Sequence, residues 1–307
     1  MRRLMFWVVR LLVKPALSPR VPVTLQRFWG SLMGLSLMGP KGATYQQTRC
    51  ADVPVMKIQP AGDTPLRTVL YLHGGAYVTG GYGSHRKLAA AVGEAAQAQV
   101  WSPDYRLAPE HPHPAALNDA LAVYRSLLEQ GQDPDGLSLV GDSAGGNLAL
   151  ELALAIRAAG LPMPASLVLL SPWTDMSLSG ESISTHAGRD PMLSADWLRW
   201  AAEVYRGEVA LRDPAVSPLF AGLAGLPPML IQVGTEEILA SDALRLHERA
   251  RDASVPCELQ VFDGLWHVFQ LHYRLLDASN QAVHKIGAFI RMHGTSRVHG
   301  GSFDATV

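Results

Sequence analysis

The sequence predicts an α/β protein built on a mostly parallel sheet with helices on both faces. From about Tyr45 onward, short apolar runs alternate with helix-like stretches, a pattern typical of parallel sheets. The runs are continuously hydrophobic, as expected for strands buried on both faces. The chain has 307 residues, 48% of them hydrophobic and 17% charged, so it can bury the core of one large globular domain.

The individual elements follow from these runs and from the turn residues between them. The expected strands are 53–59, 68–72, 100–103, 137–140, 166–170, 229–233 and 257–262. The expected helices include 115–130, 147–159, 239–253 and 278–292. The first two of these helices end at Gly131 and Gly160, since glycine is a usual helix stop.

Two segments depart from the alternation and predict a helical cap. Residues 1–44 contain helix-like pieces but no strand, and residues 177–212 become helical after Pro191. We expect both to cover the C-terminal edge of the sheet, where ligands bind in open α/β sheets. A catalytic domain of residues 45–176 and 213–293 remains, and the polar, glycine-rich residues 294–307 are expected to form a disordered tail.

Charge and cysteine content narrow the class of protein further. The formal net charge is −1 and the charged residues are mixed, which argues against a nucleic-acid partner. Cys50 and Cys257 form neither a disulfide framework nor a zinc motif. We therefore expect reduced thiols and a cytoplasmic location, with one long-range disulfide as the alternative.

The N-terminus resembles the start of a signal peptide. Arg10 and Lys14 interrupt its apolar run, which is too short for a membrane span, and no small-residue cleavage site follows. The sequence therefore predicts an amphipathic helix that packs on the protein, with weak membrane contact as the alternative.

The pentapeptide Gly141-Asp-Ser-Ala-Gly145 is the strongest candidate for chemistry. It matches G-x-S-x-G and lies between an expected strand and an expected helix, which is the arrangement of a nucleophile elbow. The flanking glycines let strand and helix approach, and the helix N-terminus favours developing negative charge. A serine in a surface turn is the default without this context, but with it Ser143 is predicted to be the nucleophile.

A serine nucleophile needs a base and an orienting acid, which follow it along the chain in this arrangement. His267 comes directly after an expected strand, at the same sheet edge as Ser143, and is the predicted base. Glu237 follows the strand that ends at residue 233 and is the first choice of acid, ahead of Asp242 and then Glu236. Other histidines are expected elsewhere, with His272 facing away and two on helix surfaces, His247 and His284.

The loop His73-Gly-Gly-Ala76 follows another expected strand and has the form of an oxyanion-hole loop. Glycines there allow backbone N–H groups to face the site. The predicted donors are the N–H groups of Gly74, Gly75 and Ala144, whereas His73 is expected to be structural.

Three stretches taken together carry a family resemblance: LHGGAYVTGG (72–81), DYRLAPEHPHPAALNDAL (104–121) and VGDSAGGNLAL (140–150). The chain resembles the bacterial hormone-sensitive-lipase-like carboxylesterases, a branch of the α/β-hydrolases, over roughly residues 45 to 292. The resemblance implies an eight-stranded, mostly parallel sheet with a helical cap. It also implies hydrolysis of short- to medium-chain acyl esters without metal or organic cofactor, and a homodimer formed through the last strand and helix.

The resemblance leaves alternatives open. Many members have aspartate in a D-P-L context where this chain reads Glu237-Ile-Leu, although a subset resembles it with glutamate. An amidase or deacetylase would use the same triad, and a silent ligand-binding homologue would retain the fold. Arg106, Glu110 and Asp119 are expected to form buried ionic contacts. Three further aromatic residues fit the core of the cap better than an acyl pocket: Trp197, Trp200 and Tyr205.

Overall fold

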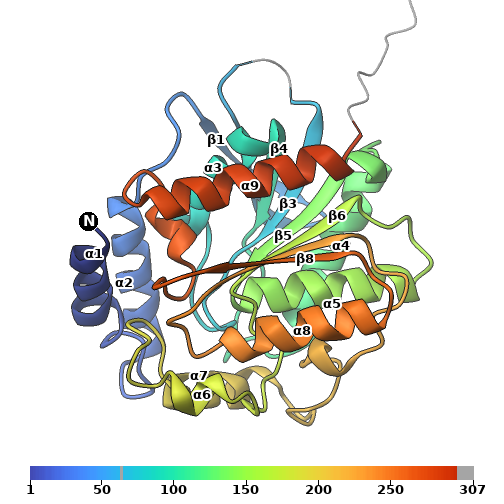
Figure 1. Cartoon of the computed structure of the whole chain (residues 1–307). Helices are drawn as coiled ribbons and strands as arrows, with labels where there is room; N and C mark the ends of the chain where they lie inside the picture. Colours follow the sequence, from blue (N-terminus) through green and yellow to red (C-terminus); the bar gives the residue numbers. More distant parts are fainter. Residues whose placement is uncertain (63–64, 296–307) are drawn as a thin grey trace, which may run out of the picture.

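The computed structural model describes residues 1–62 and 65–295. Its centre is an eight-stranded sheet with strand order β1-β2-β4-β3-β5-β6-β7-β8 (Figure 1). The strands are β1 Thr44–Cys50, β2 Val53–Gln59, β3 Arg67–Leu72, β4 Ala98–Pro103, β5 Leu137–Asp142, β6 Ser166–Leu170, β7 Met229–Gly234 and β8 Cys257–Phe262. β2 pairs antiparallel with β1 and β4, and the other neighbours are parallel, so the predicted fold class is confirmed.

Helices flank this sheet on both sides. The α-helices are α1 Arg2–Val8, α2 Val23–Ser36, α3 Tyr82–Ala96, α4 Ala115–Glu129, α5 Ala144–Ala158, α6 Ser182–Thr185, α7 Ala195–Tyr205, α8 Ala240–Asp252 and α9 Asp277–His293. The shorter elements are a π-helix, η1 Val9–Val13, and three 3₁₀ turns, η2 Pro134–Gly136, η3 Pro218–Phe220 and η4 Phe269–His272. Of the predicted tail, residues 294–307, the structure describes the first two, and the Thr295 N–H donates to the Asp135 carbonyl at 2.8 Å; residues 296–307 lie outside the described residues.

The alternation of side chains along each central strand creates two hydrophobic cores. Leu70, Leu139 and Ile231 face the core that contains α4, α5 and α8. Val140 and Leu230 face the opposite core, which contains α3 and α9. Because both faces of these strands are covered, their sequences are continuously apolar.

The sequence does not predict strand β1, because this edge strand lacks an apolar run. Its sequence TYQQTRC is polar and mostly exposed. It joins β2 through Ala51 and Asp52, which both have positive φ, of 49° and 62°. Two such residues form a type I′ hairpin turn, usually signalled by Asn-Gly rather than Ala-Asp.

The first 36 residues and the segment that contains α6 and α7 lie together at one side of the sheet (Figure 1). The indole N–H of Trp197 in α7 donates to Gln26 Oε1 in α2, at 2.9 Å. The ammonium of Lys14 donates to the carbonyl of Asp190, at 2.6 Å. Among the described residues, no helix has the length and apolar content that a membrane crossing requires.

Helix α5 contains a buried acid, Glu151, whose two carboxyl oxygens have no hydrogen-bond partner among the described residues. Burial raises its pKa well above the usual 4.5, so the folded state favours the neutral acid. The unfolded chain loses this proton near pH 4.5, so the folded state loses stability as the pH rises from there.

Replacing Glu151 with methionine is therefore expected to stabilise the protein at pH 8, by about 1–3 kcal/mol. The gain should shrink toward pH 5, where the carboxyl is neutral in a larger share of unfolded chains. Urea unfolding at both pH values measures it, and a variant that is less stable at pH 8 would contradict the prediction.

Candidate active site

Ser143 lies on a strained turn between β5 and α5. Its backbone has φ 55° and ψ −120°, a conformation that costs energy for any residue with a side chain. The turn requires glycine on both sides, because a Cβ on Gly141 would overlap the carbonyl of Gly145, and a Cβ on Gly145 would overlap that of Leu72. The serine therefore stands at the C-terminal end of the central strand and at the N-terminus of a fifteen-residue helix.

His267 and Glu237 meet in the loops that follow β8 and β7. His267 Nδ1 lies 3.0 Å from Glu237 Oε2, and both side chains are almost fully buried. The other oxygen, Oε1, accepts hydrogen bonds from Ser171 Oγ at 2.9 Å and from the Gly234 N–H at 2.5 Å. A carboxylate on Nδ1 fixes the ring and its tautomer, leaving Nε2 to take a proton.

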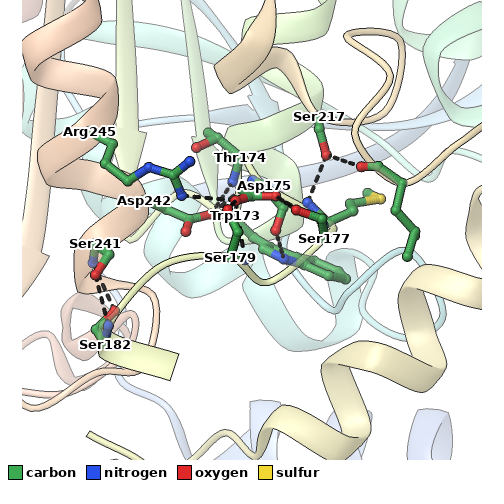
Figure 2. Close-up of polar contacts among 12 residues, drawn as sticks. Trp173, Thr174, Asp175, Ser177, Ser179, Ser182, Ser217, Ser241, Asp242 and Arg245 are labelled. Atoms are coloured by element: carbon green, nitrogen blue, oxygen red, sulfur yellow. Dashed lines mark hydrogen bonds and ion pairs between the residues drawn. The ribbon is translucent and has the colours of Figure 1, made fainter. Parts of the chain in front are cut away.

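The two other candidate acids point elsewhere. Asp242 Oδ2 accepts from the backbone N–H groups of Thr174 and Asp175, at 2.8 and 2.9 Å (Figure 2). Burial, together with the charge of Asp175, raises the pKa of Asp242 to about 7. Glu236 forms an ion pair with Arg189 at 2.5 Å. Of the three acids, Glu237 is the one that contacts His267.

The predicted oxyanion loop lies against the elbow. A Cβ on Gly74 would overlap the Asp142 carboxylate and lie 3.1 Å from Ser143 Cβ, so the backbone there is close to the serine. Gly75 has φ 120° and lines the same cavity as Ser143. Ala144 begins α5 beside them. The three predicted N–H donors therefore belong to backbone that lies next to Ser143 or lines its cavity.

His73 is a buried part of this loop. Its Nδ1 is 2.8 Å from the carbonyl oxygen of Gly74, and its ring stacks on Tyr105 at 4.2 Å. Burial, reinforced by the nearby His85, lowers the pKa of His73 to about 4. A neutral, stacked imidazole suits the structural role expected for it.

A buried cluster beneath the elbow was not predicted from the sequence. Asp142 accepts from the Tyr71 hydroxyl at 2.7 Å and lies 3.2 Å from His85 Nε2. Burial opposes its negative charge, but His85 and Tyr71 together leave the pKa of Asp142 below its usual range. Asp142 raises the pKa of His85 in turn, against the effect of burial. An acid in an otherwise apolar strand was the available sequence signal.

Two expectations were wrong. His272 does not face away: it lines the same cavity as His267, because the chain turns back through η4, and its Nε2 accepts from Trp266 Nε1 at 3.2 Å. Burial lowers the pKa of His272 to about 4.

The buried ionic contacts expected for Arg106, Glu110 and Asp119 are instead two separate, partly exposed ion pairs. These pairs are Arg106–Asp119 and Arg27–Glu110, both at 2.7 Å.

The two cysteines are both free, and Cys50 is buried. Burial raises the pKa of the Cys257 thiol to about 12, so it stays protonated at neutral pH.

Ser143 and His267 open into one cavity of about 160 Å³. Its walls are mostly apolar and come from the N-terminal segment, the 177–212 segment and the loop after β8; they include Val9, Val13, Met33, Met192, Trp197 and Leu271. Trp197 therefore belongs to the hydrophobic core and also lines the cavity. Tyr205 lies in the core, with its ring stacked on Tyr77 at 3.6 Å.

Comparison with known proteins agrees with this architecture. Residues 69–271 match the family described as alpha/beta hydrolase fold. The acetyl-hydrolase of Streptomyces hygroscopicus is 44% identical over 225 residues, which are 73% of this chain and 75% of that one. An esterase of Acinetobacter venetianus is 39% identical over 222 residues, 72% of this chain and 73% of the relative.

A crystal structure of an esterase from the bacterial hormone-sensitive lipase family superimposes with a TM-score of 0.91. It is 38% identical, with 95% of this chain and 97% of that chain covered. The chain belongs to the α/β-hydrolase fold family. Within it, the chain falls in the branch of the bacterial hormone-sensitive-lipase-like esterases and is a carboxylic ester hydrolase, which confirms the resemblance found in the sequence.

Proposed function

We propose that this enzyme is a serine carboxylesterase for short- to medium-chain acyl esters, with Ser143, His267 and Glu237 as its triad. The observation that carries the proposal is the shared cavity: Ser143, on its strained elbow, faces the same space as an imidazole whose Nδ1 lies 3.0 Å from a buried carboxylate. A serine held in this way has the base and the orienting acid that nucleophilic catalysis requires.

The reaction proceeds in two acyl-transfer steps. Ser143 Oγ attacks the ester carbonyl while His267 Nε2 takes its proton, and Glu237 stabilises the resulting imidazolium. The oxyanion of the tetrahedral intermediate accepts hydrogen bonds from the N–H groups of Gly74, Gly75 and Ala144. His267 then gives the proton to the leaving alcohol, and an acyl-enzyme remains on Ser143.

Water completes the cycle. His267 takes a proton from the water as its oxygen attacks the acyl-enzyme, and returns that proton to Ser143 Oγ as the carboxylic acid leaves. Each proton removed by the histidine is given back within the same half-reaction. The chemistry uses side chains and backbone N–H groups of this chain alone.

Hydrolysis of a series of p-nitrophenyl esters tests the proposal. A cavity of about 160 Å³ favours short acyl groups, so we expect kcat/KM to be highest between acetate and octanoate and to fall sharply at palmitate. Faster cleavage of p-nitroanilides than of matched esters would favour the amidase or deacetylase. A folded but inactive protein would favour a silent ligand-binding homologue.

We also propose the domain division and a homodimer. The contacts between α2 and α7 support a cap formed by residues 1–44 and 177–212 over a catalytic domain of residues 45–176 and 213–293. Strand β8 is an edge of the sheet, and its partly exposed side chains offer a surface for pairing with a second copy, next to Lys285 of α9, whose ammonium lies over the Phe262 ring. Light scattering coupled to size-exclusion chromatography measures the molecular mass of the protein in solution, which distinguishes a monomer from the proposed homodimer.

The free thiols of Cys50 and Cys257 support a location in a reducing compartment, for which we propose the cytoplasm. A tagged chain recovered in the periplasmic rather than the cytoplasmic fraction of its cells would contradict this.

We also propose a weak contact between the N-terminal helices and a membrane surface.

A further inference from the structure

Exposed hydrophobic side chains gather at the N-terminal end of the chain. The described residues include fourteen exposed large hydrophobic side chains, and ten of them lie within the first 38 residues. We call seven of these the N-terminal surface: Leu4, Trp7, Leu11, Leu25, Phe28, Leu32 and Leu35. A clustered apolar surface of this kind marks an interaction site more often than scattered single residues do.

The seven residues form one stripe on each of two adjacent helical segments. Residues 4, 7 and 11 have helical spacing along α1 and η1, and residues 25, 28, 32 and 35 have it along α2. Their exposed fractions range from 39% to 65%. The Trp29 indole N–H in α2 donates to the Leu12 carbonyl in η1 at 2.7 Å, so the segments lie side by side, as Figure 1 shows.

The opposite faces of these same segments form a wall of the active-site cavity. Val9 and Val13 of η1 line it, and so do Met33 of α2 and Leu37 directly after α2. Each segment thus has one apolar side toward the catalytic serine and another toward solvent. The N-terminal surface is therefore the outside of the wall that encloses the substrate.

The charged residues within the N-terminal segment itself are all of one sign. Residues 1–44 contain seven lysines and arginines and no acidic residue. Arg27 is used in an ion pair with Glu110, whereas Arg3 and Arg20 are exposed. Leucine, tryptophan and phenylalanine flanked by arginines are typical of helices that lie in the interface of an anionic membrane.

We propose that the N-terminal surface docks on an anionic lipid surface and holds the cavity against it. Ester substrates would then reach Ser143 from the lipid phase, a consequence that rests on the proposed function, whereas the docking does not. A symmetric contact with a second copy is disfavoured, because it would bring together two copies of a segment that contains seven basic residues and no acidic one.

Flotation of the full chain with vesicles tests the docking. We expect binding to vesicles of equimolar phosphatidylcholine and phosphatidylglycerol, and much weaker binding to phosphatidylcholine alone. Binding should weaken as NaCl is raised from about 0.05 to about 0.5 M, because salt screens the basic residues. The double variant Trp7→Ser/Phe28→Ser should bind the mixed vesicles at least about tenfold more weakly.

A matched control removes exposed hydrophobic residues elsewhere. Leu244→Ser/Met292→Ser changes two exposed side chains on α8 and α9 and should keep vesicle binding. Both double variants should retain hydrolysis of soluble p-nitrophenyl butyrate. Ser143→Ala should lose hydrolysis but still bind vesicles, which separates docking from catalysis.

The proposed docking is overturned if the wild-type protein does not bind anionic vesicles. It is equally overturned if Trp7→Ser/Phe28→Ser binds them as strongly as wild type does. It is also overturned if wild type binds no vesicles and forms a dimer that Trp7→Ser/Phe28→Ser dissociates. The surface would then be a contact between copies. In each case, retained hydrolysis of the soluble ester leaves the proposed function intact.

Discussion

Replacing Ser143 with alanine is expected to lower kcat for p-nitrophenyl butyrate by about 10⁴- to 10⁶-fold, because no acyl-enzyme can form without the hydroxyl. The remaining rate would come from the oxyanion donors and from substrate binding. Initial rates at saturating ester, with an active-site titration of wild type, give the ratio directly.

Ser138→Ala is the matched control for this variant. Ser138 lies on β5, the strand that leads to Ser143, and is also buried, but its hydroxyl is hydrogen-bonded to Ser166 Oγ at 2.8 Å and does not line the cavity. We expect it to retain activity within about threefold, with a small loss of stability. If Ser143→Ala kept a comparable rate, another residue would be the nucleophile.

Replacing Glu237 with glutamine should lower kcat by about 10²- to 10⁴-fold, because a neutral amide cannot stabilise the imidazolium of His267 and can favour the wrong tautomer. Asp242→Asn should change kcat by less than about threefold, since its carboxyl bonds the backbone N–H groups of Thr174 and Asp175. Rates at pH 8, with circular dichroism to verify folding, separate the two. A larger loss in Asp242→Asn than in Glu237→Gln would reverse the assignment of the acid.

Much of the fold could be predicted because the central strands are buried on both faces. The expected bounds of the buried strand β6 agree with the structure, and those of β7 differ by one residue. The bounds of β2 and of the partly exposed edge strand β8 also agree, because both have apolar residues along much of their length. β1 could not be predicted in this way, because an edge strand with a polar sequence and an Ala-Asp turn shows neither apolar continuity nor a usual hairpin signal.

The candidate site was predictable where chain order and strand ends determine position. Ser143, Glu237 and His267 each follow a strand at the same sheet edge, so their proximity follows from topology. Contacts set by loop shape could not be read in this way. The Ser171 hydroxyl donates to Glu237 because the loop after β6 runs next to this acid. His272 lines the cavity because the chain reverses direction at Val268, whose backbone is left-handed.

The loop 171–177 connects the three parts of the candidate triad. The Trp173 N–H donates to the Ser143 carbonyl at 3.1 Å, and Ser171 Oγ donates to Glu237 at 2.9 Å. The same hydroxyl accepts from the Val268 N–H at 3.1 Å, next to His267. Asp242, with Arg245 and Asp175 nearby, holds this loop from the other side (Figure 2).

The segment between this loop and β7, which contains α6 and α7, begins and ends at neighbouring positions beside α5. The Met176 N–H donates to Ser217 Oγ at 2.7 Å, and the Asn147 amide donates to the carbonyls of Trp173 and Val216 at 2.8 and 3.1 Å. Both ends are thus fastened to α5, the helix that starts at the nucleophile. We expect that replacing the intervening residues by the corresponding segment of a relative would alter ester preference through Met192 and Trp197, which line the cavity, while leaving Ser143 in place.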